Sequence, residues 1–264
     1  MVAEVNRWWI GVAALVAAAV VLGPLLGDPD AADFASILAG PSLANPLGTD
    51  QLGRDLLLRL LAGAQLTLGI SVVTVLVTGV VGIGSGMVAG YRGGPGARVL
   101  MRTVDVLAAL PTVLLGLLAA AILGPGIGSL LVAIWLVGWT PFARQAYQLT
   151  VTERGRDYVE GAVALGAGPA RVLVRHVARN LAPPLLAHAC VRFAATLLTV
   201  SGLSFLGLGV APPTAEWGAM VAEGREYLFV APHVVLVPSV AVVAVAVLVT
   251  VAGRRISTAD RARS

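Results

Sequence analysis

One uncharged stretch decides the class of this protein: LTLGISVVTVLVTGVVGIGSGMVAG, residues 66–90. A helix needs about 20 mostly apolar residues to cross a bilayer, so this stretch is long enough to be a span. Of the 264 residues, 58% are hydrophobic and only 12% are charged, with a mean hydropathy of +0.89. Soluble domains carry roughly 25% charged residues. The composition therefore excludes a water-soluble fold and predicts an all-α, polytopic membrane protein.

Five further apolar runs are also long enough to cross a membrane. The six transmembrane helices expected are Trp8–Leu26, Leu66–Gly90, Thr103–Leu123, Ile127–Tyr147, Pro184–Leu208 and Pro232–Gly253. The first run is longer than the roughly 7–15 apolar residues of a secretory signal, and no small-x-small site follows it, so we expect an uncleaved span. Pro111 and Pro238 each remove a backbone donor and are expected to kink their helices.

The basic residues indicate the orientation in the membrane. The formal net charge is +4, and the chain has no lysine. Arginines gather in alternate connections between the spans, whereas acids such as Asp50 and Glu223 gather in the others. Positive charge marks cytoplasmic loops, so we expect both termini to be cytoplasmic. The arginines form no continuous stripe, which argues against a nucleic-acid partner, and the single Cys190 excludes an internal disulfide.

Three glycines recur every four residues in the second span: Gly82, Gly86 and Gly90. This spacing places them on one helical face, where another helix can approach closely. The stretch is rich enough in glycine to suggest a dinucleotide-binding loop, but no strand precedes it. We therefore interpret it as a packing surface.

The arginine-rich connection between the fourth and fifth spans, residues 148–180, predicts two helices with a corner between them. Asp157 and Glu160 have the spacing of a capping box, so a helix should begin near Tyr158. Gly166 supplies its stop, and the proline three residues later suits the first turn of the next helix.

The first of these helices is too short to be stable alone, since helices under about 12 residues are marginal in water. Tyr158, Val159, Ala162 and Leu165 give it an apolar face. Two interpretations follow from the residues. The face packs on the protein's own helix ends, or it is a docking surface for a separate soluble protein.

This loop resembles the cytoplasmic coupling signature of permease subunits in ATP-binding-cassette (ABC) importers, in which Glu160, Ala162 and Gly166 occur in this order before a helix. Further segments resemble the dipeptide, oligopeptide and nickel permease group, in particular its second, C-type subunit, over roughly residues 45–255. These segments are NPLGTDQLGRD (45–55), LMRTVDV (100–106) with Pro111, GPG (124–126) and LSFLGLGVAPPTAEWGAM (203–220).

The resemblance implies a type I ABC importer permease fold in a bacterial cytoplasmic membrane. Its core permease domain would be residues 66–255, between an N-terminal part (1–65) and a cytoplasmic tail (256–264). The chain would form half of a translocation path for peptides, with nickel or another small solute as the alternative. Implied partners are a second homologous permease, two ATPase domains on one or two chains, and an external solute-binding protein. Implied coupling residues are Asp157, Tyr158, Glu160, Ala162, Leu165, Gly166 and Arg171.

The loop departs from the family pattern in two places. Gly161 stands where the family commonly has alanine, which should loosen the short helix by up to ~1 kcal/mol. Ala178 and Arg179 stand where the family commonly has Leu-Pro. We expect Pro183 and Pro184 to mark the entry to the fifth span instead.

We expect no catalytic residues, metal or cofactor in this chain. A Walker loop needs a lysine to neutralise phosphate charge, and the chain has none, so ATP and magnesium should bind to partner subunits. The three histidines have no zinc-binding spacing, and no Gly-x-Ser-x-Gly motif is present. An intramembrane protease is the alternative enzyme class. A secondary transporter or channel would share the spans but would not need a docking helix.

Charges within the spans are candidates for the translocation path. Asp105 lies three residues after Arg102, so a local ion pair is expected, and a contact with the solute is the alternative. Arg192 lies ~13 Å into the fifth span at ~1.5 Å per residue, which is far for simple snorkelling. We expect it to line the path and favour anionic cargo, or to pair with a carboxylate of the partner permease.

The segment before the last span, residues 212–226, has the pattern of an amphipathic helix on the outer surface. Trp217 would anchor it at the membrane interface. The segment would cap the cavity, seat the solute-binding protein, or do both.

Overall fold

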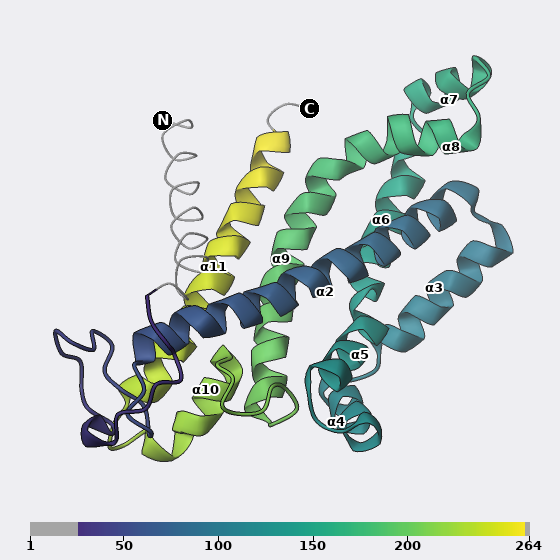
Figure 1. Ribbon diagram of the computed structural model, residues 1–264. Coiled ribbons are helices and arrows are strands. Elements are labelled where there is room, and N and C mark those ends of the chain that lie inside the picture. Colours follow the sequence, from purple (N-terminus) through teal and green to yellow (C-terminus); the bar gives the residue numbers. More distant parts are fainter. Residues whose placement is uncertain (1–25, 262–264) are drawn as a thin grey trace. The chain divides into compact units, whose positions relative to one another are not determined.

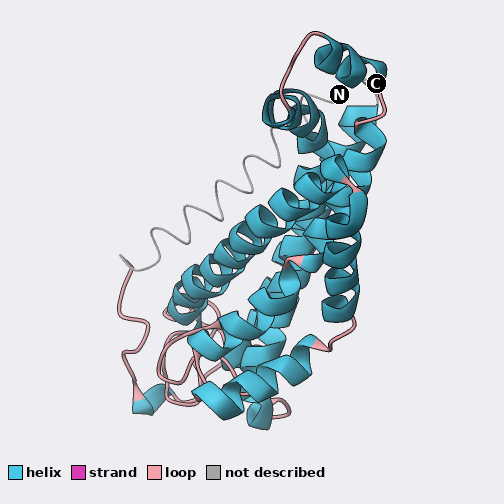
Figure 2. Cartoon of the chain, turned by 90° about the vertical axis from the view of Figure 1, so that its right-hand side faces the viewer, coloured by secondary structure: helices cyan, strands magenta, loops and turns pink. Residues whose placement is uncertain are grey.

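The chain is helical over the part that the computed structural model describes, residues 26–261. Apart from its last residue, the first expected span lies outside these residues. Figures 1 and 2 show helices and loops, and no strand occurs in the described part. In chain order the elements are η2 (Phe34–Ser36), α2 (Leu56–Arg92), α3 (Gly94–Ala108), α4 (Thr112–Leu123), α5 (Ile127–Gly138), α6 (Thr140–Glu153), α7 (Asp157–Ala164), α8 (Pro169–Arg171), η3 (Val172–Val177), α9 (Ala178–Phe205), α10 (Trp217–Gly224), η4 (Arg225–Tyr227) and α11 (His233–Arg261).

Within residues 26–261, four helical stretches are long and apolar enough to cross a membrane: Leu56–Arg92, Ile127–Glu153, Pro169–Phe205 and His233–Ile256. They correspond to the second, fourth, fifth and sixth expected spans. The first of them begins earlier than expected, because the Asp55 carboxylate accepts the first free N–H groups of the helix at 2.7 and 3.2 Å.

The third expected span, Thr103–Leu123, is not one helix. α3 and α4 meet at an angle of 82° and form either a broken span or a re-entrant segment. Pro111 has no N–H group and disfavours helical backbone at Leu110, which explains the break. The kink expected at Pro111 is therefore a complete interruption of the helix.

The other prolines lie within continuous helices. Pro183 and Pro184 are inside α9, and Pro238 is inside α11. The prolines expected to mark the entry to the fifth span therefore do not interrupt the helix, because one helical stretch runs from Pro169 to Phe205. This stretch contains the π-helical segment η3 ahead of the two prolines. Such local changes of hydrogen bonding let membrane helices tolerate proline.

The chain divides into two compact units. Unit 1 comprises Met1–Val72, Ala120–Leu130 and Ala195–Leu248, and unit 2 comprises Val73–Ala119, Leu131–Ala194 and Val249–Ser264. Helices α2, α4, α5, α9 and α11 contribute residues to both units.

Buried ion pairs join the loop before α2 to α2 and α10 in unit 1. The side chains of Arg54 and Arg59 are only 3% and 1% exposed. Arg54 Nε lies 2.7 Å from Asp50 Oδ2, and Arg59 Nη1 lies 2.8 Å from Asp30 Oδ1. Glu223 Oε2 lies 3.2 Å from Arg54 Nη2 and 3.6 Å from Arg59 Nη2. We call these five residues the arginine network, and it lets α2 begin with a charged residue in its first turn.

Helix α10 is held inside unit 1 and not at a surface. Trp217 is 4% exposed, and its indole N–H donates to the Leu60 carbonyl at 2.9 Å. Glu216 is fully buried, accepts the Ala219 N–H at 3.0 Å and accepts the Thr67 hydroxyl at 2.8 Å. The expectation of a surface helix anchored by Trp217 is therefore wrong, because the indole finds its hydrogen-bond partner on α2.

In unit 2, α2 packs closely on α6 along its glycine face, which carries Gly82, Gly86 and Gly90. A Cβ at Gly86 would collide with the Ala143 main chain, and one at Gly90 would lie 2.8 Å from the Tyr147 carbonyl oxygen. Only hydrogen fits at these positions, so the two backbones can approach each other.

Candidate coupling site

Helix α7 is the short helix expected in the arginine-rich connection. It begins one residue earlier than expected, with Arg156 at the N-cap position and no side-chain cap. The expected capping box is therefore wrong. Asp157 and Glu160 both lie in the first turn, where their charges interact favourably with the positive end of the helix dipole.

The end of α7 is a Schellman motif, which confirms the expected stop at Gly166. Gly166 has a φ of +83°, in the left-handed region that favours glycine. Its N–H donates to the Val163 carbonyl at 2.9 Å, and the Ala167 N–H donates to the Ala162 carbonyl at 3.0 Å. The next helix begins at Pro169, also as expected, and leads through η3 into α9.

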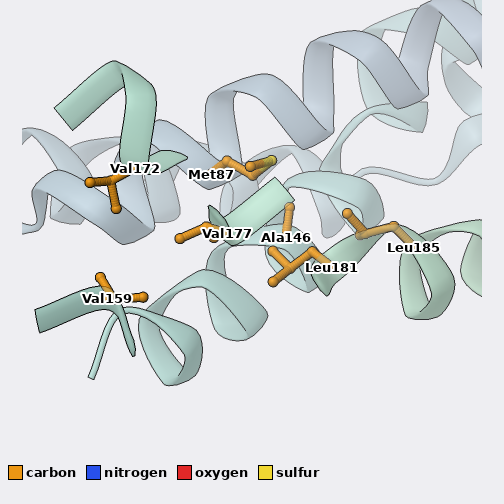
Figure 3. Close-up of a cluster of buried hydrophobic side chains, with 7 residues drawn as sticks. All are labelled: Met87, Ala146, Val159, Val172, Val177, Leu181 and Leu185. Atoms are coloured by element: carbon orange, nitrogen blue, oxygen red, sulfur yellow. The ribbon is translucent and has the colours of Figure 1, made fainter. Parts of the chain in front are cut away.

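A small apolar core in unit 2 supports α7 (Figure 3). Val159 is the buried residue of α7, at 3% exposure, and Ala162 packs against the cluster. The other buried members come from α2, α6, η3 and α9: Met87, Ala146, Val172, Val177, Leu181 and Leu185. A two-turn helix needs such packing to be stable, so this contact fixes where α7 lies.

The last turn of α7 exposes apolar side chains. Leu165 is 91% exposed and Val163 is 50% exposed. The charged side chains of Asp157, Glu160 and Arg171 are exposed on the same corner of the chain. Charged groups are costly in lipid, so this corner lies in water or against another protein. An apolar centre with charged neighbours is the composition of a protein–protein contact.

Tyr158 contacts its own protein through its hydroxyl. The hydroxyl donates to Glu153 Oε1 at 2.7 Å and accepts from Asn180 Nδ2 at 3.0 Å. Burial first, and then the bond to Glu153, raise the pKa of Tyr158, so the group stays a neutral donor. The apolar face expected from the sequence is therefore divided. Val159, Ala162 and the Tyr158 hydroxyl lie toward the protein, whereas Leu165 points away from it.

Sequence reasoning missed three residues at this corner: Glu153, Arg154 and Asn180. Arg154 Nη1 donates to the last carbonyl groups of α2, at 3.1 Å from Gly90 and 3.2 Å from Tyr91. An arginine suits this position, because the C-terminal end of a helix is negative. No local pattern marks these contacts, since the partners are far apart in the sequence.

Comparison with known proteins shows the family of the chain. A family model described as "Binding-protein-dependent transport system inner membrane component" matches residues 82–259, which include α7 and every residue of the buried cluster that supports it. The chain belongs to this family. As a member, it is a permease subunit of an ABC importer and a multi-pass membrane protein.

Curated relatives place the permease in the dipeptide, oligopeptide and nickel group. The Di/tripeptide transport system permease protein DppC of Pseudomonas aeruginosa is 40% identical over 196 residues, 74% of this chain and 65% of that protein. The Glutathione transport system permease protein GsiD of Pectobacterium atrosepticum is 37% identical over 210 residues, 80% of this chain and 70% of that protein. The Nickel transport system permease protein NikC of Escherichia coli K12 is 36% identical over 242 residues, 89% and 87% of the two chains.

Solved structures agree on the fold. A chain of the MetNI methionine ABC transporter in an inward-facing conformation aligns with a TM-score of 0.62. The alignment covers 76% of the permease and 96% of that chain at 20% identity. The permease therefore has the membrane-domain fold of an ABC importer.

Arg192 is a half-buried basic group without a counter-charge in the described part of the chain. It lies in α9, and its Nε is buried without a hydrogen-bond acceptor. One turn earlier, His188 Nε2 is also buried without a partner, and the ring packs edge-on against Phe142 with centroids 5.3 Å apart. The two basic side chains lie on adjacent turns of a membrane helix with no acid beside them. We therefore expect their hydrogen-bond acceptor to come from outside the described part of the chain.

Asp105 has a different partner from the expected one. Its Oδ1 lies 2.6 Å from Nη2 of Arg144 on α6, and not beside Arg102. Both side chains are about half exposed, at 55% and 49%. The ion pair joins α3 to α6 in unit 2. The sequence suggested only the pair on one helix, because Arg144 is distant in the chain.

Proposed function

We propose that this permease forms half of the translocation path of an ATP-driven importer, and that α7 transmits the movement of the ATPase subunits to the membrane helices. The observation that carries the proposal is the exposure of Leu165 and Val163 on a helix that its own core holds in place. Removing an exposed leucine side chain from water is favourable, so a partner that covers Leu165 would gain binding free energy. Glu160, Gly166 and Arg171 lie around this surface and belong to the same contact.

The partner that fits this surface is an ATPase subunit. The chain has no lysine, and the phosphate-binding loop of such ATPases requires one. ATP and magnesium would therefore bind to separate subunits, and this chain would hydrolyse nothing. Closure of two ATPase domains would move α7, and the helices packed on it would follow as a body.

The complete importer would contain a second permease subunit, two ATPase domains and an external solute-binding protein, in a bacterial inner membrane. The permease would span the membrane six times with cytoplasmic termini, because α7 and its arginines belong on the side where ATP is present. Residues 66–255 would form the core translocation domain, with the coupling loop at 148–180.

The test is copurification from cells that coexpress this chain with the second permease and the ATPase subunits. We expect the complex to hydrolyse ATP and the isolated chain not to. Leu165→Arg should reduce the amount of ATPase retained about tenfold, because a charge replaces the apolar centre. Leu43→Arg is the control, since Leu43 is fully exposed in unit 1. Solute uptake by the chain without any ATPase would favour a secondary transporter and contradict the proposal.

Peptides are the proposed cargo, with nickel as the alternative that the relatives suggest. Arg192 favours the first, because an unpaired guanidinium within the span attracts a carboxylate and repels a divalent cation. A role for Asp105 in the path is the weaker proposal, since Arg144 already neutralises its charge.

Uptake measurements would test the cargo proposal. In liposomes that contain the complete importer, Arg192→Gln should raise the KM for a dipeptide about tenfold, which corresponds to ~1.4 kcal/mol. Arg192→Lys keeps the charge and should change the KM much less. Unchanged kinetics in Arg192→Gln would instead favour a structural pair with the other permease. Nickel uptake that improves in Arg192→Gln would favour the metal as cargo.

A further inference from the structure

Glu153 joins three helical segments at the corner of unit 2. It is the last residue of α6, and its side chain is 9% exposed. Oε1 accepts the Tyr158 hydroxyl of α7 at 2.7 Å and the Asn180 Nδ2 of α9 at 3.1 Å. Oε2 lies 3.1 Å from Arg156 Nε, in the turn before α7.

The hydrogen bonds of this group form a closed triangle. The Tyr158 hydroxyl has one hydrogen, which it donates to Glu153, and its oxygen accepts from Asn180 at 3.0 Å. The two hydrogens of the Asn180 amide therefore serve the carboxylate and the hydroxyl. A carboxylate that lacked these donors would be costly in so buried a position. The three side chains thus determine one another's orientation.

The triangle lies at one end of α7. Val159 is the buried residue of the helix, and Tyr158 is its neighbour, so the first turn holds the buried side chain and the triangle, while Ala162 in the second turn also packs against the core. The last turn carries Leu165, which is 91% exposed. A partner that contacts Leu165 therefore acts on the end of α7 opposite the triangle.

We propose that Glu153 is a positioning residue that makes α6 and α9 follow the movement of α7, through its bonds to Tyr158 and Asn180. This inference rests on the proposed function, in which an ATPase contacts α7. It assigns Tyr158 to the connection inside the permease and not to the ATPase contact. The apolar core keeps α7 in place, and the triangle prevents it from tilting or rotating on that core.

Two variants separate this role from simple support. Glu153→Gln keeps an acceptor oxygen for both Tyr158 and Asn180 and loses only the ion pair with Arg156. Glu153→Ala removes every bond of the triangle that involves position 153. The two variants have similar charge, so a difference between them reports on the hydrogen bonds.

The experiment uses the assembled importer in nanodiscs, with Cys190→Ala as background and spin labels at Ala164 of α7 and Ala182 of α9. Electron–electron distance measurements are made without nucleotide and with ATP, magnesium and vanadate. The background protein and Glu153→Gln should show one narrow distance in both conditions. Glu153→Ala should at least double the width of the distribution, most clearly with nucleotide, while the ATPase activity stays within about twofold.

A narrow, unchanged distance in Glu153→Ala, with ATPase bound and active, would overturn the inference and leave the proposed function intact. A broad distance in Glu153→Gln would overturn it as well, since the acceptor is still present. Failure of any ATPase to copurify with the unaltered permease would contradict the proposed function instead.

Discussion

The arginine network and the α7 corner are held together by opposite means. In unit 1, two guanidinium groups meet three carboxylates, and Arg54 and Arg59 are almost completely buried. In unit 2, α7 is attached by the buried Val159 and by the bonds of Tyr158, while its last turn remains exposed. The first region resists displacement because separating its charges is costly. The second has one buried side chain, in its first turn, and an exposed last turn.

This contrast suggests that the arginine network and the α7 corner have different roles in the permease. A region with many buried charge pairs suits a fixed framework, because removing one partner leaves another charge buried. A short helix with one buried side chain suits a moving part, because local stability is low where few buried contacts exist. Mutations in the first region should therefore change stability, and mutations at the exposed end of α7 should change coupling.

The largest effect is expected from Arg59→Gln. The change leaves Asp30, Asp50 and Glu223 with one cation instead of two, and breaking a buried ion pair costs about 3–5 kcal/mol. Unfolding of the purified permease by denaturant would measure the loss. Arg225→Gln, at an exposed position of η4, should change stability by less than about 0.5 kcal/mol. Equal effects of the two changes would contradict the framework role of the arginine network.

Gly86→Leu should come next, at about 1–3 kcal/mol or more, because the side chain would collide with the Ala143 main chain. The loss would show that unit 2 depends on close contact between α2 and α6. Gly84→Leu is the matched control on the same helix, since a Cβ there meets no atom within 4 Å. Thermal unfolding of both variants would measure the difference in stability. A Gly86→Leu variant as stable as Gly84→Leu would contradict the close packing of α2 on α6.

Two valines of α7 give a sharper comparison within the corner itself. Val159→Ala should destabilise by roughly 1–2 kcal/mol, from ~0.8 kcal/mol per buried carbon group and a small cavity. It should speed hydrogen exchange in α7. Val163→Ala, at a half-exposed site, should leave exchange unchanged and weaken ATPase binding. The reverse pattern would mean that the assignment of buried and contact residues in α7 is wrong.

The smallest effects concern the glycines of α7. Gly166→Ala places a side chain at a φ of +83° and should cost about 1 kcal/mol of helix stability. Gly161→Ala should have the opposite sign and stabilise α7 by up to ~1 kcal/mol, because a Cβ at Gly161 meets no atom within 4 Å. Helix content and exchange rates of α7 would report both changes. Destabilisation by Gly161→Ala would contradict its placement.

Hydropathy predicted the long helices well, because a membrane span is a local property of the sequence. The earlier start of α2 was missed, since Arg59, which interrupts its apolar pattern, is paired with acids elsewhere in unit 1. The break between α3 and α4 was underestimated, because a proline in an apolar run is compatible with either a kink or an interruption.

At the corner, the sequence predicted Gly166 and Pro169 as helix boundaries, since both act through local backbone geometry. It did not predict that the Tyr158 hydroxyl faces inward or that Trp217 is buried. Both side chains are amphipathic, and their orientation depends on partners outside their own helix: Glu153 on α6 and Asn180 on α9 for the hydroxyl, and the Leu60 carbonyl on α2 for the indole.

The most direct test of the central claim is a cross-link between α7 and the ATPase in the assembled importer. With Cys190→Ala as background, Leu165→Cys would carry a thiol-specific photoactivatable cross-linker, and Phe229→Cys in unit 1, where Phe229 is 97% exposed, would serve as the control. We expect position 165 to cross-link to the ATPase subunit and position 229 not to. A complex that retains its ATPase but gives no cross-link from position 165 would contradict the claim that α7 contacts the ATPase and transmits its movement.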